Sequence, residues 1–233
     1  VTAYAITSSF PSLTGDASIS FWMNLGANSS YRGLVSSKNY YTVGIDNNFA
    51  LQLVNGNSLR LVMANGTSTD MQTWTPTIST STWYHVVLVL DTSANTATCY
   101  FDGVAEASIL STTKTWADIS TGFLIATFFL YGSYYSSGHV NGKFDEVSIF
   151  SSALSAANVT TIYNSGTPTD LSSLSPVGWW RMGDGDTYPM LNDEQAYSNR
   201  SVDFDGVSQY VTMGDVLDED GTGAFSISAW VKL

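Results

Sequence analysis

Hydrophobic and polar side chains alternate along several short segments of the chain, and turn-forming residues separate these segments. In residues 17–25, Ile19 and Phe21 alternate with Ser18 and Ser20. Because successive side chains of an extended strand point to opposite faces, this period of two predicts a β-strand with one hydrophobic face.

The same pattern recurs along the chain and predicts a mainly β structure. Seven further strands are predicted, in residues 40–45, 49–54, 58–63, 83–90, 96–101, 122–131 and 142–150. Asn55-Gly56-Asn57 predicts a tight hairpin turn, and residues 91–95 predict a loop that joins two antiparallel strands.

One segment has the period of a helix instead. Ser155 is a suitable N-cap, Val159 and Ile162 belong to a hydrophobic stripe, and Gly166 follows the last turn, so a helix is predicted over residues 155–164. Residues 167–176 have no sustained period and are predicted to be a linker.

Composition agrees with this picture and excludes several functions. Hydrophobic residues make up 44% of the 233 positions and charged residues only 12%, which fits a β-sandwich and excludes a disordered chain. Eight basic residues against 20 acidic ones give a net charge of -12, so a nucleic-acid partner is not expected. Membrane insertion is not expected either, because no hydrophobic run approaches the ~20 residues that span a bilayer.

The end of the chain repeats its beginning. Ser18–Leu25 reappears as Ser226–Leu233, and the offset between Ser18 and Ser226 is 208 residues. A Thr-Gly pair precedes both copies, at Thr14 and at Thr222. We interpret the chain as one period of a tandem array plus a short overlap, which starts inside one module and stops inside the next.

At these segments the sequence resembles the laminin-G-like family of the concanavalin A-like lectin/glucanase superfamily. The segments that carry the resemblance are Val202–Val211, Ser226–Val231, Trp83–Asp91, Thr98–Val104, Asn141–Phe150 and Trp179–Asp186. The amino-acid sequences of these segments are also similar to those of laminin-G-like modules in structural proteins of marine tailed bacteriophages. The resemblance implies an all-β fold, a jelly-roll sandwich of two antiparallel sheets with one short helix.

The resemblance also implies an order of domains. Residues 1–166 would form a laminin-G-like module without its own N-terminal strand, residues 167–176 a linker, and residues 177–233 the first part of a following module. Two interpretations remain for the overlap. Residues 202–213 either complete the first sandwich by pairing with residues 142–150, or belong to an ordinary second module.

Catalysis is not expected. Glycoside hydrolases need two carboxylates that face each other across the scissile bond, and the Glu-x-Asp-x-x-Glu pattern of the superfamily's laminarinase-like branch is absent. Asp145 and Glu146 are adjacent, so an extended strand would point them to opposite faces. In relatives, calcium lies where the first and closing strands meet. The resemblance therefore implies a structural Ca²⁺ site at Asp145, Asp203 and Asp205, although turn formation would also explain these residues.

Sugar binding needs exposed aromatic rings beside hydrogen-bonding groups. A loop rich in Gly, Ser and Tyr is the strongest candidate, and Tyr31, Tyr40 and Tyr41 are further ones. The site residues predicted for carbohydrate are Tyr131, Tyr134, Tyr135, His139 and Trp74. Packing in the core would explain many of the aromatic residues equally well.

These observations predict a non-catalytic module of a tandem-repeat protein on a virion surface or outside a cell. It would bind host-surface glycans or other virion or surface proteins, or act as a structural spacer, and it could assemble as a homo-oligomer. The alternative is an accessory module of a glycan-active hydrolase whose catalytic part lies elsewhere.

Overall fold

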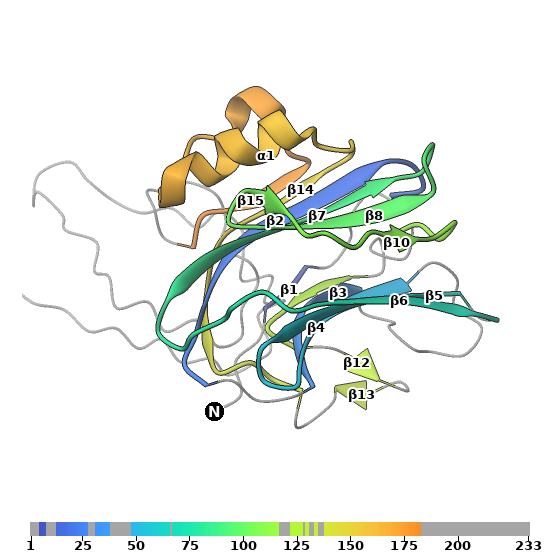
Figure 1. Ribbon diagram of the computed structural model, residues 1–233, viewed down its shortest axis with the longest axis horizontal. Coiled ribbons are helices and arrows are strands. Elements are labelled where there is room, and N and C mark those ends of the chain that lie inside the picture. The colour runs from blue at the N-terminus through green and yellow to red at the C-terminus, as the bar shows by residue number, and fades with distance from the viewer. Residues whose placement is uncertain are drawn as a thin grey trace, which may run out of the picture. The chain divides into compact units, whose positions relative to one another are not determined.

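The computed structural model describes residues 5–7, 13–27, 31–37, 48–65, 67–116, 122–127, 129–130, 133–134 and 138–182. These residues form two antiparallel sheets that pack face to face, with one helix on the outside of one sheet (Figure 1). The predicted fold class, an all-β sandwich with a single short helix, is therefore confirmed.

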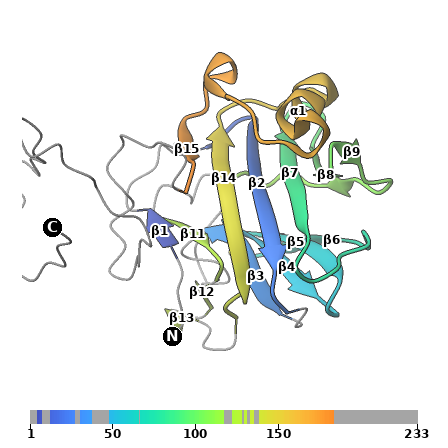
Figure 2. The same cartoon turned by 90° about the vertical axis from the view of Figure 1, so that its left-hand side faces the viewer.

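The first sheet lies under the helix. In spatial order its strands are β10 (Leu110–Ser111), β8 (Thr96–Phe101), β7 (Trp83–Asp91), β2 (Ala17–Leu25), β14 (Gly142–Phe150) and β15 (Gly178–Trp180), and β9 (Val104–Ala105) pairs with β8. Figure 2 shows β15, β14, β2 and β7 side by side. Strands β2, β7, β8 and β14 coincide within a residue with the predicted ones.

The second sheet lies on the other side of the core. Its order is β1 (Ala5–Thr7), β11 (Phe123–Ile125), β3 (Arg32–Ser37), β4 (Asn48–Val54), β5 (Ser58–Ala64) and β6 (Thr69–Trp74). A separate hairpin of β12 (Phe129–Leu130) and β13 (Ser133–Tyr134) lies near this sheet (Figure 1). Asn55 and Gly56 have φ values of 53° and 80° and form the predicted turn between β4 and β5.

Two hydrophobic clusters hold the layers together. The larger cluster fills the space between the sheets and includes Ile19, Phe21 and Met23, the residues of one predicted face of β2. The smaller cluster lies between the first sheet and helix α1 (Ala156–Tyr163), where Val159 and Ile162 are buried. The first sheet is thus covered on both faces.

The helix begins and ends as its sequence predicts. Ser155 is the N-cap, its hydroxyl accepts a hydrogen bond from Asn158 N–H, and the Asn158 side chain completes a capping box. Asn164, with φ 43°, ends the helix, and two 3₁₀ turns follow, η2 (Asn164–Gly166) and η3 (Ser172–Leu174). The segment predicted to be a linker also packs against the sandwich, because Leu171 is buried in the smaller cluster.

One predicted strand is wrong. Residues 122–131 do not form a continuous strand, because Ala126 has φ 65° and its N–H donates to the Leu34 carbonyl. The chain therefore leaves the sheet after β11, and among the described strands β12 pairs only with β13. The predicted strand at 40–45 lies outside the described residues, as does the proposed pairing of residues 202–213.

Candidate ligand-binding site

A buried serine–histidine pair lies between the first sheet and the helix. Ser20 Oγ and His85 Nε2 are 2.8 Å apart, and the imidazole ring contacts both Trp22 and Tyr163, at centroid distances of 5.0 and 6.0 Å. Burial lowers the pKa of His85 to about 4. The pair resembles a nucleophile and its base, but neither residue is more than 1% exposed, so a substrate cannot reach the hydroxyl.

Glu146 is a buried carboxylate at an irregularity of β14. The pairing of β14 with β2 shifts between Asp145 and Ser148, and Glu146 has a φ of 48°. Its Oε2 accepts a hydrogen bond of 2.5 Å from Trp179 Nε1, and its Oε1 lies 3.3 Å from Arg181 Nε. Burial raises the pKa of this carboxyl, although the partners oppose the shift.

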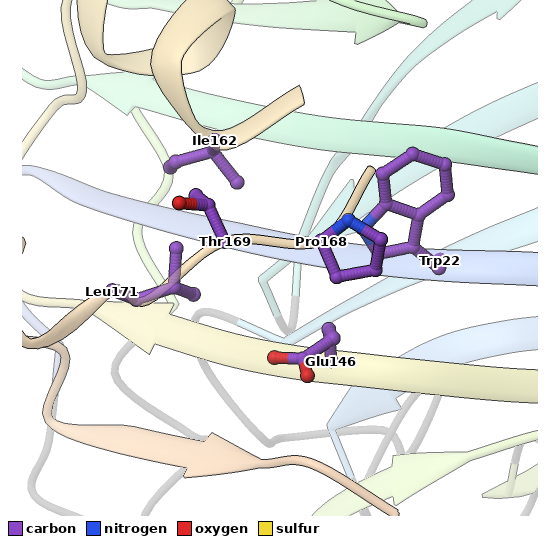
Figure 3. A pocket seen from close by; sticks show the side chains of 6 residues that line it. All are labelled: Trp22, Glu146, Ile162, Pro168, Thr169 and Leu171. Atoms are coloured by element: carbon purple, nitrogen blue, oxygen red, sulfur yellow. The ribbon is translucent and has the colours of Figure 1, made fainter. Parts of the chain in front are cut away.

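Beside Glu146 is a small hollow, which Figure 3 shows from close by. Its lining residues are Trp22, Glu146, Ile162, Pro168, Thr169 and Leu171, and the space between them has no room for a water molecule. Pockets that bind small molecules are usually about 300–1,000 Å³, so this hollow does not fit a sugar ring. The helix-covered face therefore offers a structural polar cluster rather than a ligand site.

The second sheet presents a different group of side chains on its outer face. The hairpin of β4 and β5 places Gln52 opposite Arg60, and Arg60 Nη2 donates to Gln52 Oε1 at 3.0 Å. The Arg60 guanidinium lies 5.4 Å from the ring centroid of Tyr31, a cation–π contact, and Tyr31 is 52% exposed. Arg60 Nε is buried and has no hydrogen-bond partner in the described part of the chain.

A second cation, Arg32, lies on the other face of this sheet. Arg32 pairs with the core residue Leu53, whereas Gln52 and Arg60 pair with each other on the outer face. Burial together with the Arg32 charge lowers the pKa of His139. Among the described residues, Arg60 forms no salt bridge, although the protein carries 20 acidic side chains. We call Tyr31, Gln52 and Arg60 the Tyr31 cluster.

The residues predicted to bind carbohydrate lie in different environments. His139 lies close enough to Arg32 for the Arg32 charge to contribute to lowering its pKa. Trp74 lies instead in the core, where it is 3% exposed and its Nε1 donates to the Ser108 carbonyl at 2.7 Å, so its ring face cannot contact a sugar. Tyr134 lies in β13, and Tyr131 and Tyr135 lie outside the described residues.

The predicted calcium ligands are described only in part. Asp145 Oδ1 accepts a hydrogen bond of 2.8 Å from Glu146 N–H, whereas Asp203 and Asp205 lie outside the described residues. Calcium needs six to eight oxygen ligands. In the described ranges, no group of three acidic, histidine or cysteine residues could hold a metal ion.

Sequence reasoning named Tyr31 but missed Arg60 and Gln52. The signal was present, because the Asn55-Gly56-Asn57 turn fixes the register and makes Gln52 and Arg60 cross-strand neighbours. The contact between Arg60 and Tyr31 could not be read from the sequence, because it joins segments that are not adjacent in the chain. No helix in the described ranges is long and apolar enough to cross a membrane.

Three solved structures with this fold show how the chain compares with known proteins. A heptameric SAP-like pentraxin from Limulus polyphemus is 13% identical, with a TM-score of 0.54 over 70% of this chain and 76% of its own. A putative carbohydrate-binding protein from Bacteroides ovatus is 16% identical, with a TM-score of 0.60 over 81% of this chain and 54% of its own. The CBM40 of a Ruminococcus gnavus IT-sialidase, bound to α2,3-sialyllactose, is 13% identical, with a TM-score of 0.54 over 68% and 97%.

Comparison of sequences places the chain more directly. None of the curated protein sequences matches it significantly. The laminin-G-type profile of the concanavalin A-like lectin/glucanases superfamily, however, matches residues 1–160, which include every strand of the two sheets except β15. The chain therefore belongs to the concanavalin A-like lectin/glucanases superfamily, in its laminin-G branch.

Proposed function

We propose that this protein is a non-catalytic glycan-binding module and that the Tyr31 cluster holds the sugar. The observation that carries the proposal is the exposed ring of Tyr31 beside the guanidinium of Arg60, which the buried Gln52 holds in place through a hydrogen bond. An aromatic face covers the apolar side of a sugar ring, and neighbouring polar groups bind its hydroxyls. The predicted loop with Tyr131, Tyr134 and Tyr135 would supply further contacts.

The charge of Arg60 favours an acidic sugar. Arg60 has no salt-bridge partner among the described residues, in a protein with a net charge of -12. A guanidinium binds a carboxylate or sulfate with charge-assisted hydrogen bonds, and the half-buried guanidinium of Arg60 lies against the exposed ring of Tyr31. We therefore propose glycans that carry a carboxylate or a sulfate group.

The structural relatives support the functional class. The Bacteroides ovatus protein is described as a putative carbohydrate-binding protein, and the Ruminococcus gnavus domain was solved with a sialylated sugar. Because the sequence identity to these proteins is low, the proposed position of the binding site depends on the residues of this chain alone.

Glycan binding is tested on an array with neutral, carboxylated and sulfated glycans, with and without calcium, followed by calorimetry on the strongest ligand. Tyr31→Ala should weaken binding about tenfold, because an aromatic contact contributes on the order of 1 kcal/mol. Trp83→Ala is the matched control, because Trp83 is an exposed aromatic residue, 42% accessible, on the other sheet.

Three results would contradict parts of this proposal. Absence of binding to every glycan, with and without calcium, would reject the lectin function and leave the structural-spacer alternative. Equal affinities of Tyr31→Ala and the unmodified protein would place the site elsewhere. Unchanged discrimination between acidic and neutral glycans in Arg60→Gln would reject the role of the guanidinium.

We propose a setting in which the module is one of several in a tandem-repeat protein on a virion surface or outside a cell, where it binds host-surface glycans or surface proteins. The internal repeat and the resemblance to phage modules support this setting. Calcium at Asp145, Asp203 and Asp205, assembly as a homo-oligomer, and the role of an accessory module beside a hydrolase stay predictions.

A further inference from the structure

Strand β15 belongs to the first sandwich in space, although it follows the helix and the linker segment in sequence. It pairs with β14 in antiparallel register, with Trp180 opposite Val147 and Gly178 opposite Ile149. Val177 N–H also donates to the Ile149 carbonyl at 2.7 Å. β15 is thus the last strand of its sheet and covers the edge of β14 (Figure 2).

The two tryptophans of β15 enter both hydrophobic layers. Trp180 packs against the cluster between the sheets, where its ring stacks with that of Phe123 at 6.2 Å and an interplanar angle of 19°. Trp179 packs against the cluster under α1. Because alternate side chains of a strand point to opposite faces, one short strand contributes to both layers.

A polar anchor holds the same segment in place. Trp179 Nε1 and Arg181 Nε both contact the carboxylate of Glu146, and the Arg181 guanidinium lies 5.0 Å from the centroid of the Trp179 ring. Glu146 is 3% exposed and has a left-handed backbone conformation. A buried carboxylate on a strained backbone is retained only where specific partners compensate for its burial, and here both partners come from the segment after the linker.

We infer that residues 177–182 are the closing strand of the sandwich that precedes them, given by the start of the next module, so that consecutive modules of the array are joined by strand addition. The partner surface is the edge of β14, and the partner is another copy of the same module. This extends the fold beyond residue 160, where the family match ends, and moves the boundary of the module past the linker.

The sequence repeat explains why the source of the strand matters. In an array with an offset of 208 residues, every β14 has two candidate donors, a β15 that follows it and a β15 that precedes its own module. Val147 and Trp180 are close in the chain, whereas the separation from Trp180 to the β14 of the following copy is about five times larger. Loop-closure entropy favours the nearer donor by about tenfold.

A doubled chain tests which donor is used. Residues 1–210 are followed by the full chain 1–233, a join that matches Val1-Thr2 to Val211-Thr212 and gives a period of 210 residues, two more than the offset of the Ser18 repeat. Ser148 and Trp179 are direct neighbours across the two strands. Their Cα separation in a sheet of ~4.5–5.5 Å suits a disulfide, so both are changed to cysteine in a Cys99→Ala background.

Two arms carry the same substitutions in different copies. In the first arm both cysteines lie in the first copy, and in the second arm Trp179→Cys lies in the first copy and Ser148→Cys in the second. If β15 pairs with the β14 that precedes it, a disulfide forms under mild oxidation in the first arm only. A disulfide only in the second arm would show that β15 closes its own following module, and a disulfide in neither arm would show that β15 does not lie beside β14. Either result overturns the inference.

A second measurement uses the single chain without the introduced cysteines. Trp179→Phe removes the indole donor of Glu146, so amide hydrogen exchange in residues 145–150 should become about tenfold faster. Trp83→Phe is the control, because Trp83 lies on β7 and is no partner of Glu146. Equal exchange in the two variants would contradict an anchoring role for Trp179.

Discussion

His85 has no exposed surface and packs against the rings of Trp22 and Tyr163. Its Nε2 faces Ser20 Oγ, whereas its Nδ1 has no hydrogen-bond partner within the described structure. Such a site accepts a neutral imidazole and disfavours an imidazolium, because a buried charge would lack a counter-ion. Protonation of His85 therefore opposes folding, so the stability of the protein depends on pH.

The coupling predicts a loss of stability in acid. The pKa of His85 is about 4 in the folded state and 6.5 without burial, so the unfolded chain binds the proton more tightly. Stability is therefore complete above pH 6.5 and falls as the pH is lowered toward 4, by about 3 kcal/mol in total. Urea unfolding at a series of pH values measures the effect.

His85→Gln isolates this contribution, because glutamine cannot titrate and still offers a polar group to Ser20. Asp102 and Glu146 also titrate, with pKa values that burial raises, and they are unchanged in the variant. The difference between the two proteins should therefore slope with pH between 4 and 6.5. Parallel curves would mean that His85 does not cause the acid sensitivity.

At the scale of elements, the close pairing of β14 with β2 depends on Gly142. A Cβ atom at this position would lie 2.5 Å from the Asn24 carbonyl oxygen and 3.1 Å from Leu25 Cα. Both are backbone atoms and cannot move aside without separating the strands. Gly142→Ala should therefore cost about 2 kcal/mol of stability, measured by thermal or urea unfolding.

The matched control is Gly15→Ala. Gly15 is exposed, and a Cβ there would meet nothing within 4 Å, so the change should be close to neutral. Equal unfolding midpoints for Gly142→Ala and the unmodified protein would show that the two strands can separate at this end without cost.

The elements also show what the sequence could predict and what it could not. β2 and β14 were predicted to the residue, and the N-cap of α1 was predicted at Ser155, whereas Asn164 and not the predicted Gly166 is the left-handed residue that ends the helix. These features depend on local alternation and capping chemistry. Ala126 has a left-handed backbone conformation, which alanine rarely adopts, so the sequence did not indicate a break at this position. The strand at 122–131 was therefore predicted too long.

The candidate site was harder to predict for a similar reason. The sequence pointed to Tyr31 and His139 by residue type, but Trp74 has the same type and lies in the core. Period-two alternation tells which residues share a face of a strand and does not tell which face another layer covers. The Tyr31–Arg60 contact and the pairing of β15 with β14 both join distant segments, so both needed the structure.

At the scale of the whole molecule, two sheet edges are linked by an ion pair. β6 and β10 are the outermost strands on one side of their sheets. Lys114 Nζ, just after β10, lies 2.7 Å from Asp70 Oδ2 on β6, and Thr112 donates to the same oxygen at 2.7 Å. Burial alone would raise the pKa of Asp70, but the Lys114 and Thr112 hydrogen bonds lower it overall.

This link predicts a cost for opening the sandwich. Lys114 is only 5% exposed, so Lys114→Met leaves Asp70 without its counter-ion and should lower the free energy of unfolding by about 1–3 kcal/mol. Adding Asp70→Asn should restore part of the loss, because no unpaired charge then remains. A double variant less stable than the single one would contradict this explanation, and urea unfolding measures both.

The covering of β2 on both faces bears on which of its residues the internal repeat preserves. Toward the other sheet, Ile19 and Leu25 recur as Ile227 and Leu233, whereas Phe21 and Met23 are replaced by Ala229 and Val231. Toward the helix, Ser18, Ser20 and Trp22 are identical in both copies. Ser18 bonds the Ser152 carbonyl and Leu154 N–H, and Ser20 contacts His85. A neighbour of another size can refill an apolar gap, whereas a directed polar contact accepts few substitutes. The two copies therefore differ in the size of two core side chains and keep the serines that form directed polar contacts in β2.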